Sequence, residues 1–348
     1  MNKENISSLE FGVLSTYLLK TFIFINGINI LLDINKNDSI ISIIIGILLG
    51  ILIVKIFNSL NDNSIFTTID NNFSKVISFI IKLLLLISSI SIASYLLYSI
   101  SIFIKTSLLN KVDILPISIL FILTSLYSYK KGIKTIFRSA FISCFIFILL
   151  EIISFLFLTP NIDSTKILPL ATHSLTNICK GSIIYIFLSI VPIFFLLVVP
   201  NKKDEKKFKF FYIITSIYIL FSFILILSVI DANLATMIDY PQLFILSKIS
   251  VINFFDRMEG ILSFKYIFDS FFTLSIIFYY IKKALVSITN NFKFKQIKKI
   301  SKYSIYVITL IIIFFSNYIE FNNLIIITTL IVFGIINIFI ALKKFIYK

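Results

Sequence analysis

Long, uninterrupted apolar runs are the feature of this sequence that most limits its fold. Ten stretches consist mainly of Ile, Leu, Phe and Val, and a transmembrane helix needs about 20 such residues. A soluble domain could not bury so many runs of this length, and the mean hydropathy of +1.02 agrees. The runs are continuous and do not alternate with a period of two, so they predict helices and not barrel strands. We therefore predict an all-α polytopic membrane protein with one domain, 1–348.

The distribution of basic residues tests the number of spans and predicts their orientation. With the N-terminus on the cytoplasmic side, the inner segments carry 22 of the 32 Lys and Arg residues and the outer segments, with Lys265 among them, carry 8. Basic residues gather on the cytoplasmic side of membrane proteins, so this bias predicts an even number of spans and both termini inside. The predicted spans are 11–32, 39–57, 76–103, 114–129, 136–158, 180–200, 210–230, 263–281, 303–319 and 323–342.

The net charge of +15 and the reactive residues exclude several function classes. The lysines are dispersed over short cytoplasmic loops, where they orient the protein and contact anionic lipid of the bilayer, so they do not indicate a nucleic-acid partner. His173 is the only histidine, and no metalloprotease or serine-hydrolase motif is present. Cys144 and Cys179 lie in unrelated segments. We therefore expect no catalytic residues, no metal and no cofactor.

One predicted outer connection contains an unusual cluster of charges. Within 231–262, small and polar residues recur every three or four positions and apolar residues occupy another face. This period predicts an amphipathic helix over 242–260 at the outer surface, beginning after Pro241. Arg257 and Glu259 are two positions apart and do not face each other on a helix. They are either an ordinary solvated face or part of a cap that closes an outward-facing cavity.

Three patches resemble one family. "DYPQLFILSKISVINFFDRMEGILSFK" is similar to the segment before the eighth helix in the B subunits of spore germinant receptors, permease-like members of the amino acid–polyamine–organocation superfamily. Their Arg-x-Glu signature in this region is matched by Arg257 and Glu259. "ILPLATHSLTNICKGSIIYIFLSIVPIFFLLVVPNKKDEKK" resembles their sixth helix with its preceding loop. "ISSLEFGVL" and "INGINILLDINKNDSIIS" resemble their opening and first helix.

The sequence departs from the family pattern at two positions. Asp33 stands where the family usually has a Pro, and Lys265 and Tyr266 stand where it usually has a Trp. The resemblance nevertheless covers most of the chain. It implies a five-plus-five inverted repeat, like that of the bacterial leucine transporter, with repeats of roughly 11–158 and 180–319 and a tenth helix at 323–342. It also implies that helices one and six are broken near the bilayer midplane.

A broken helix presents free backbone groups that a small ligand can satisfy. In helix one we expect the break within "TFIFINGIN", and in helix six within "CKGSIIY". An intact helix whose Asn side chains bind a neighbour is the alternative for helix one. Two tyrosines of helix three lie one turn apart on one face, which aromatic packing alone would also explain. The ligand-binding candidates are Thr21, Phe22, Asn26, Gly27, Tyr95, Tyr98, Gly181, Ser182 and Tyr185.

Ionisable residues inside predicted spans are functional candidates. Lys82 and Glu151 are close enough to an interface that their charges can extend to it. Lys20 lies near the midplane of helix one, and Asp269 lies about two turns into helix eight, which this fold packs beside helix one. We expect the two to form a buried pair whose ammonium stands where related transporters hold a sodium ion.

The resemblance implies a receptor for a small nutrient germinant, with an amino acid as the expected ligand. The partners that it implies are a membrane-anchored A subunit and a lipoprotein C subunit in the spore inner membrane. An amino acid secondary transporter is the alternative, because the same fold serves both functions. In either case Arg257 and Glu259 would be fixed charges that stabilise a closed vestibule or a subunit contact. They would have no part in proton transfer.

Overall fold

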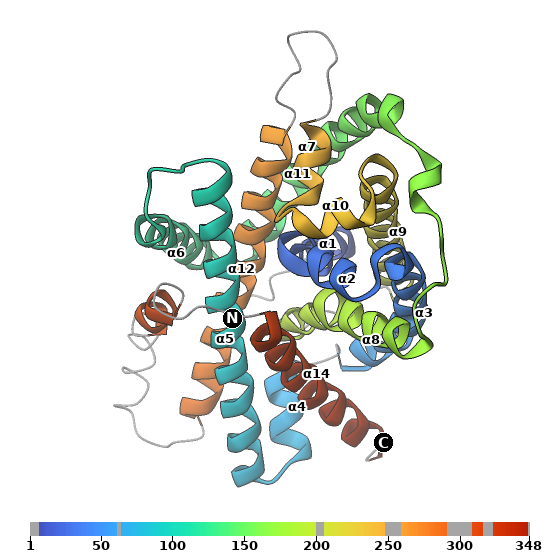
Figure 1. The fold of residues 1–348 in the computed structure, drawn as a ribbon. Coiled ribbons are helices and arrows are strands. Elements are labelled where there is room, and N and C mark those ends of the chain that lie inside the picture. Colours follow the sequence, from blue (N-terminus) through green and yellow to red (C-terminus); the bar gives the residue numbers. More distant parts are fainter. Residues whose placement is uncertain are drawn as a thin grey trace.

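Helices make up every secondary-structure element in the described part of the chain (Figure 1). The structure is a computed structural model and describes residues 7–60, 64–199, 205–247, 259–290, 308–315 and 323–346. The elements in chain order are α1 (Ser8–Phe22), η1 (Ile23–Gly27), α2 (Ile28–Asn35), η2 (Lys36–Asp38), α3 (Ser39–Leu60), α4 (Ile65–Asn72), α5 (Lys75–Ser107), α6 (Ile114–Lys131), α7 (Ile133–Leu158), η3 (Thr159–Asn161), η4 (Ser164–Ile167), α8 (Leu175–Tyr185), η5 (Ile186–Ile190), η6 (Val191–Val198), α9 (Glu205–Val229), α10 (Ala232–Met237), α11 (Pro241–Leu246), α12 (Glu259–Asn290) and α14 (Asn323–Ile346).

Seven stretches of the described chain are long and apolar enough to cross a membrane. The first, Ser8–Leu60, has 53 residues and contains two of the expected spans. The chain turns between them at Lys36, whose φ of 44° lies in the left-handed region. The predicted fourth span corresponds to α6, and most of the ninth lies outside the described residues. The protein is thus a polytopic helical membrane protein, and the total of ten spans stays a prediction.

Short polar residues fix where several helices begin. Ser7 accepts a hydrogen bond from the backbone N–H of Glu10, and the Glu10 carboxylate accepts one from the Ser7 backbone, which is a complete capping box for α1. Ser174 caps α8 and Asp231 caps α10 by the same principle. These caps satisfy N–H groups that have no partner within the helix.

The first helix lies at the centre of the bundle. Eleven of the fifteen residues of α1 are buried, and α1 packs against α7, α9, α12 and η5. Figure 1 shows α1 and α2 among α8, α9, α10 and α12. In contrast, α7 exposes large apolar side chains over most of its length. An apolar face of this extent is what a helix presents to lipid.

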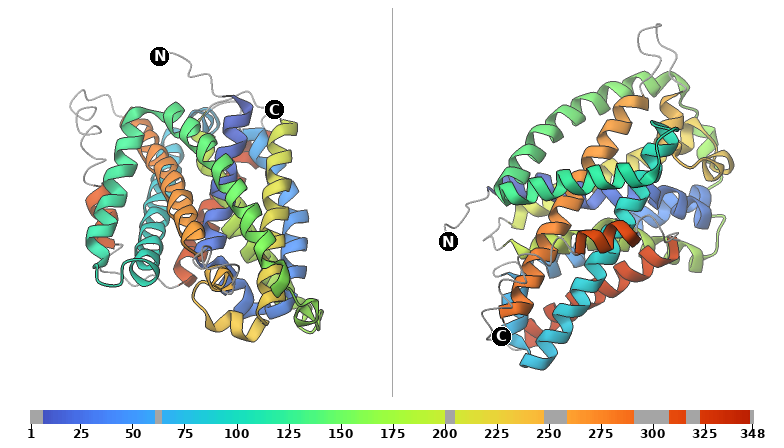
Figure 2. Two further views of the ribbon diagram at one scale, coloured as in Figure 1. Left: turned by 90° about the horizontal axis from the view of Figure 1, so that it is seen from above. Right: turned by 90° about the vertical axis from the view of Figure 1, so that its left-hand side faces the viewer.

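One end of the bundle, here named the α10 face, is formed by α10, α11, the α2–α3 turn and residues 159–174 (Figure 2). The charge distribution predicts that this face is the outer one. Of the predicted amphipathic helix 242–260, the structure contains α11, which starts at Pro241 as expected and ends at Leu246. Residues 248–258 lie outside the described part, Arg257 among them. Helix α10 was not predicted.

Candidate functional site

Helix one contains a π-helical segment where the sequence predicts a break. At η1 the backbone N–H of Ile28 bonds the carbonyl of Ile23, five residues back, and not that of Phe24. The carbonyl oxygen of Phe24 is thereby released and accepts a hydrogen bond of 3.2 Å from the Gln242 side chain on α11. The irregularity thus lies within the expected window but does not unwind the helix. Single π turns of this kind are frequent at functional sites.

Helix six contains a second π-helical segment. In η5 the backbone N–H of Val191 bonds the carbonyl of Ile186, and the 3₁₀ segment η6 follows directly. This irregularity begins one residue beyond the window that the sequence predicts. The two π segments touch, because a Cβ atom on Gly27 would lie only 3.2 Å from Cδ1 of Leu188. The missing side chain at Gly27 therefore allows helix six to approach helix one.

The predicted ligand residues on helix one bind neighbouring helices. The Asn26 amide donates to the Tyr95 hydroxyl at 2.7 Å and to Ser99 of α5 at 3.3 Å. The Thr21 hydroxyl lies 2.8 Å from that of Thr273 on α12. Phe22 is buried and Tyr98 is half-buried. For Asn26, the alternative of an amide that bonds a neighbouring helix is what the structure shows.

The predicted ligand residues on helix six face a different side. A Cβ atom on Gly181 would lie 2.2 Å from the side-chain nitrogen of Asn35, and one on Gly46 of α3 would lie 2.5 Å from the Tyr185 ring. The Ser182 hydroxyl donates to a backbone carbonyl one turn earlier. This group therefore packs α8 against α2 and α3. The nine candidates fall into two sets with different neighbours.

Lys20 and Asp269 lie together between α1 and α12. The ammonium nitrogen is 3.1 Å from a carboxylate oxygen, with side chains that are 10% and 3% exposed. The ammonium also lies 4.7 Å from the centre of the Tyr17 ring. The second carboxylate oxygen of Asp269 has no hydrogen-bond partner in the described residues. A buried ammonium and carboxylate in contact neutralise each other inside an apolar bundle.

A second buried ion pair was not predicted. Lys265, one turn before Asp269 on α12, contacts the Glu151 carboxylate of α7 and the Tyr218 hydroxyl of α9. The Tyr218 hydroxyl in turn donates to Glu151 at 2.9 Å. Lys265 lies within the apolar stretch Leu262–Thr289 and its side chain is only 1% exposed, so counting it among the outer-segment residues was wrong. Lys265 and Asp269 are four residues apart and therefore share one face of the helix. This spacing is the sequence signal that Lys265 faces the same side as the buried Asp269, although it does not identify Glu151 as the partner.

Lys82, another lysine inside a predicted span, also pairs with a carboxylate. Its side chain has no exposed surface, and its ammonium lies 2.6 Å and 2.7 Å from the two oxygens of Asp70 on α4. The pair holds the short helix α4 against α5. The Lys82 ammonium thus ends on Asp70, whose side chain is 39% exposed, and the expectation that its charge extends toward an interface stays a prediction.

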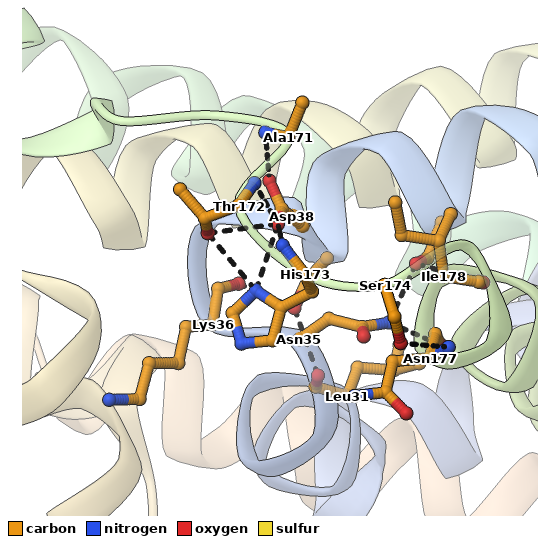
Figure 3. A network of polar contacts seen from close by, with 12 residues as sticks. Leu31, Asn35, Lys36, Asp38, Ala171, Thr172, His173, Ser174, Asn177 and Ile178 are labelled. Atoms are coloured by element: carbon orange, nitrogen blue, oxygen red, sulfur yellow. Dashed lines mark hydrogen bonds and ion pairs between the residues drawn. The ribbon is translucent and has the colours of Figure 1, made fainter.

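A carboxylate on the α10 face binds the loop that leads into helix six (Figure 3). Asp38, at the end of η2, has no exposed surface. It accepts hydrogen bonds from the backbone N–H groups of Ala171, Thr172 and His173, from the Thr172 hydroxyl and from the His173 ring. We call these four residues the loop latch. The sequence alone did not identify the partners of Asp38.

The described residues contain no cluster of three His, Cys, Asp or Glu side chains that could hold a metal ion. Arg257 lies outside the described part of the chain. Glu259 is the first residue of α12, and its side chain is not described. The expected contacts of these two charges therefore stay predictions.

The geometry described so far belongs to a helical membrane protein with paired π segments and buried ion pairs. The model of a family described as spore germination protein, the spore permeases, matches residues 34–324. The chain belongs to this spore germination family. The matched range includes every element from η2 to α12. No curated protein matches the chain. As a spore permease, the protein is a membrane protein of the permease type connected with germination.

Proposed function

We propose that this spore permease is the B subunit of a nutrient germinant receptor. It would bind a small germinant, an amino acid, where the π segments of helices one and six meet near the bilayer midplane. It would work with a membrane-anchored A subunit and a lipoprotein C subunit in the spore inner membrane, with both termini in the cytoplasm. Membership of the spore germination family supports this function, because it links a permease-type chain to germination.

The observation that carries the proposal is the contact between η1 and η5. Two irregular helical segments from opposite halves of the chain meet at Gly27 and Leu188. Each π turn shifts the backbone hydrogen bonds of its helix and can release a carbonyl group, as it does at Phe24. A small zwitterion that reaches such groups can replace their present partners. Its binding would then be communicated to both helices at once.

The Lys20–Asp269 pair supports the same function in a second way. By the rise of an α-helix, Lys20 lies about 18 Å from the start of α1, which is close to the middle of a bilayer core. We propose that its ammonium occupies the position where related transporters hold a sodium ion. A fixed cation at that position would allow the protein to respond without sodium.

Germination of spores that lack this chain tests the proposal. The deletion strain and the parent are exposed to single amino acids and other small nutrients, and uptake of the labelled nutrient by vegetative cells is measured alongside. A receptor predicts that the response to one nutrient is lost while its uptake is unchanged. Normal germination with lost uptake would instead establish the alternative, an amino acid secondary transporter. Reintroduction of the intact gene, which must restore the response, is the control.

A further inference from the structure

A largely apolar chamber lies beside Phe24 of helix one. It is bounded by α7, α9, α11 and α12, and its free volume of about 30 Å³ has room for about two water molecules. Its walls are mostly apolar, and the walls from α7, α9 and α11 include Phe147, Phe155, Leu225, Ile226, Ile245 and Leu246. None of the predicted ligand residues lines this chamber. Of helix one, Phe24 lines the chamber, and Phe24 lies within the predicted break.

The ammonium group of Lys265 fills the polar side of the chamber. It lies 4.7 Å from the centre of the Phe24 ring and 4.6 Å from the centre of the Tyr218 ring. The Glu151 carboxylate contacts it directly, and so does the Tyr218 hydroxyl. Two aromatic rings and a carboxylate around one cation form the arrangement by which proteins bind ammonium ligands. We call Phe24, Tyr218 and Glu151 the ammonium box.

Two further polar groups in the chamber wall have no hydrogen-bond partner in the described part of the chain. The side-chain oxygen of Gln242 and the hydroxyl of Tyr266 are buried and make no hydrogen bond with any described residue. The residues that carry them are 5% and 1% exposed. Buried polar groups are almost always hydrogen-bonded, so each of these two requires an explanation. A ligand with additional N–H or O–H groups would satisfy them.

We infer that the ammonium box is a binding site for a small primary ammonium compound, and that Lys265 occupies it as an internal substitute in this structure. The ligand would consist of an ammonium group for the box and a short apolar body for the aromatic and aliphatic walls. Lys265 has a flexible four-carbon stem, so its ammonium can withdraw and leave its place to the ligand. The volume that the Lys265 head releases adds to the small free space of the chamber.

The box is connected to helix one through a single residue. The Phe24 ring forms one wall, while the Phe24 carbonyl, released by the π turn, accepts the hydrogen bond from Gln242. A ligand that engages the Gln242 oxygen and the Phe24 ring therefore acts on the η1 segment from both sides. That the natural ligand is an amino acid, whose α-ammonium would enter the box, rests on the proposed function. Binding of a primary ammonium ion does not.

Binding of ethylammonium to the purified protein in detergent tests the inference. The thermal unfolding temperature is measured against ethylammonium chloride, with sodium chloride at equal ionic strength as the control. In Lys265→Met the box is empty, so we expect ethylammonium to stabilise this variant with a half-maximal concentration at least tenfold lower than in the wild type. The double variant K265M/E151Q lacks the carboxylate and should show no such stabilisation. Equal stabilisation of both variants, or none in folded Lys265→Met, would overturn the proposal.

A second variant keeps the test decisive should Lys265→Met fail to fold. Tyr218→Phe retains the ring of the box and removes only the hydroxyl that binds both Lys265 and Glu151. Lys265 is then held less firmly, and ethylammonium should act at a concentration several-fold lower than in the wild type. An unchanged concentration dependence would contradict the inference. Because the readout is unfolding of the purified protein, a failure of the germination experiment leaves this result independent, and the reverse also holds.

Discussion

Replacement of Asp38 by Asn is the most direct test of the structure. The Asp38 carboxylate has no exposed surface and accepts five hydrogen bonds from three consecutive residues of the loop that precedes helix six. Four of these bonds reach one oxygen, and the fifth, from the Ala171 N–H, reaches the other. Asparagine has the same shape, but it keeps one acceptor oxygen and replaces the other by a donor.

The magnitude follows from the bonds that an amide cannot make. In its better orientation, the introduced amide keeps the four-bond oxygen and directs its NH₂ group at the Ala171 N–H, so that one bond is lost and two donors face each other. The remaining four bonds lose their charge assistance, which roughly doubles the strength of a hydrogen bond. Bonds to a charged group contribute about 1.5–3 kcal/mol each, but the shallow position of the latch on the α10 face allows water to replace part of the loss. We expect the free energy of unfolding to fall by about 2–4 kcal/mol.

Two measurements in detergent check this expectation. Denaturant unfolding gives the stability, and limited trypsin digestion reports whether the latch has opened. Lys166 in the same loop donates to the Val229 carbonyl at 2.8 Å, and cleavage after it should accelerate when Asp38 no longer anchors the loop. Asp163→Asn removes an equal charge from an exposed side chain that bonds Thr165 within the loop, and it should behave as the wild type. If Asp38→Asn is as stable and as resistant to trypsin as Asp163→Asn, the latch contributes nothing to closure.

Substitutions at three further places, each with its expected outcome, can be measured in the same unfolding assay. Gly181→Ala places a Cβ atom 2.2 Å from the side-chain nitrogen of Asn35 on α2 and should lower the free energy of unfolding by about 1–3 kcal/mol. Gly260→Ala is the control, because its Cβ atom would have no neighbour within 4 Å and the free energy of unfolding should not change. Lys82→Met leaves the Asp70 carboxylate, which is 39% exposed and can be rehydrated, so the free energy of unfolding should fall by only about 2 kcal/mol. An unchanged free energy of unfolding would show that the Lys82–Asp70 pair does not hold α4 in place. Lys20→Met leaves the Asp269 carboxylate buried without a counter-charge, which should lower the free energy of unfolding by about 3–5 kcal/mol. The double variant K20M/D269N should recover at least half of that loss. If Lys20→Met and Asp269→Asn each leave folding and the germinant response intact, the pair has neither a structural role nor a role as a cation substitute.

The apolar runs predict much of the fold because the bilayer imposes their length. Each described span begins and ends within about nine residues of its predicted limits, since the hydrocarbon thickness sets a minimum length of about 20 apolar residues for a spanning helix. The start of α11 was also predictable, because proline is favoured at the first position of a helix and α11 begins at Pro241. The short helix α10 was missed because six residues carry too few periods to show an amphipathic pattern.

The rotation of each helix about its axis could not be predicted. The membrane helices are apolar on most sides, so their sequences do not indicate which face meets which neighbour. For that reason the sequence suggests Gly181 and Tyr185 as ligand residues but does not indicate that they pack α8 against α2 and α3. The same ambiguity places Glu151 near an interface and its partner Lys265 in an outer segment. Only where an opposite charge was available at the expected depth, as for Lys20 and Asp269, did the sequence indicate the two partners.

The order of charges along α12 restricts how this helix can move. Lys265 and Asp269 are one turn apart and carry opposite signs, and their partners, Glu151 and Lys20, lie on two different helices. Sliding α12 along its axis by one turn, about 5.4 Å, in the direction that carries Lys265 to the level of Asp269 would set two ammonium groups against each other. Translation of α12 past α1 and α7 is therefore opposed electrostatically, while tilting about the two pairs is not. While both ion pairs are intact, they therefore favour a rocking motion of α12 over a translation along its axis.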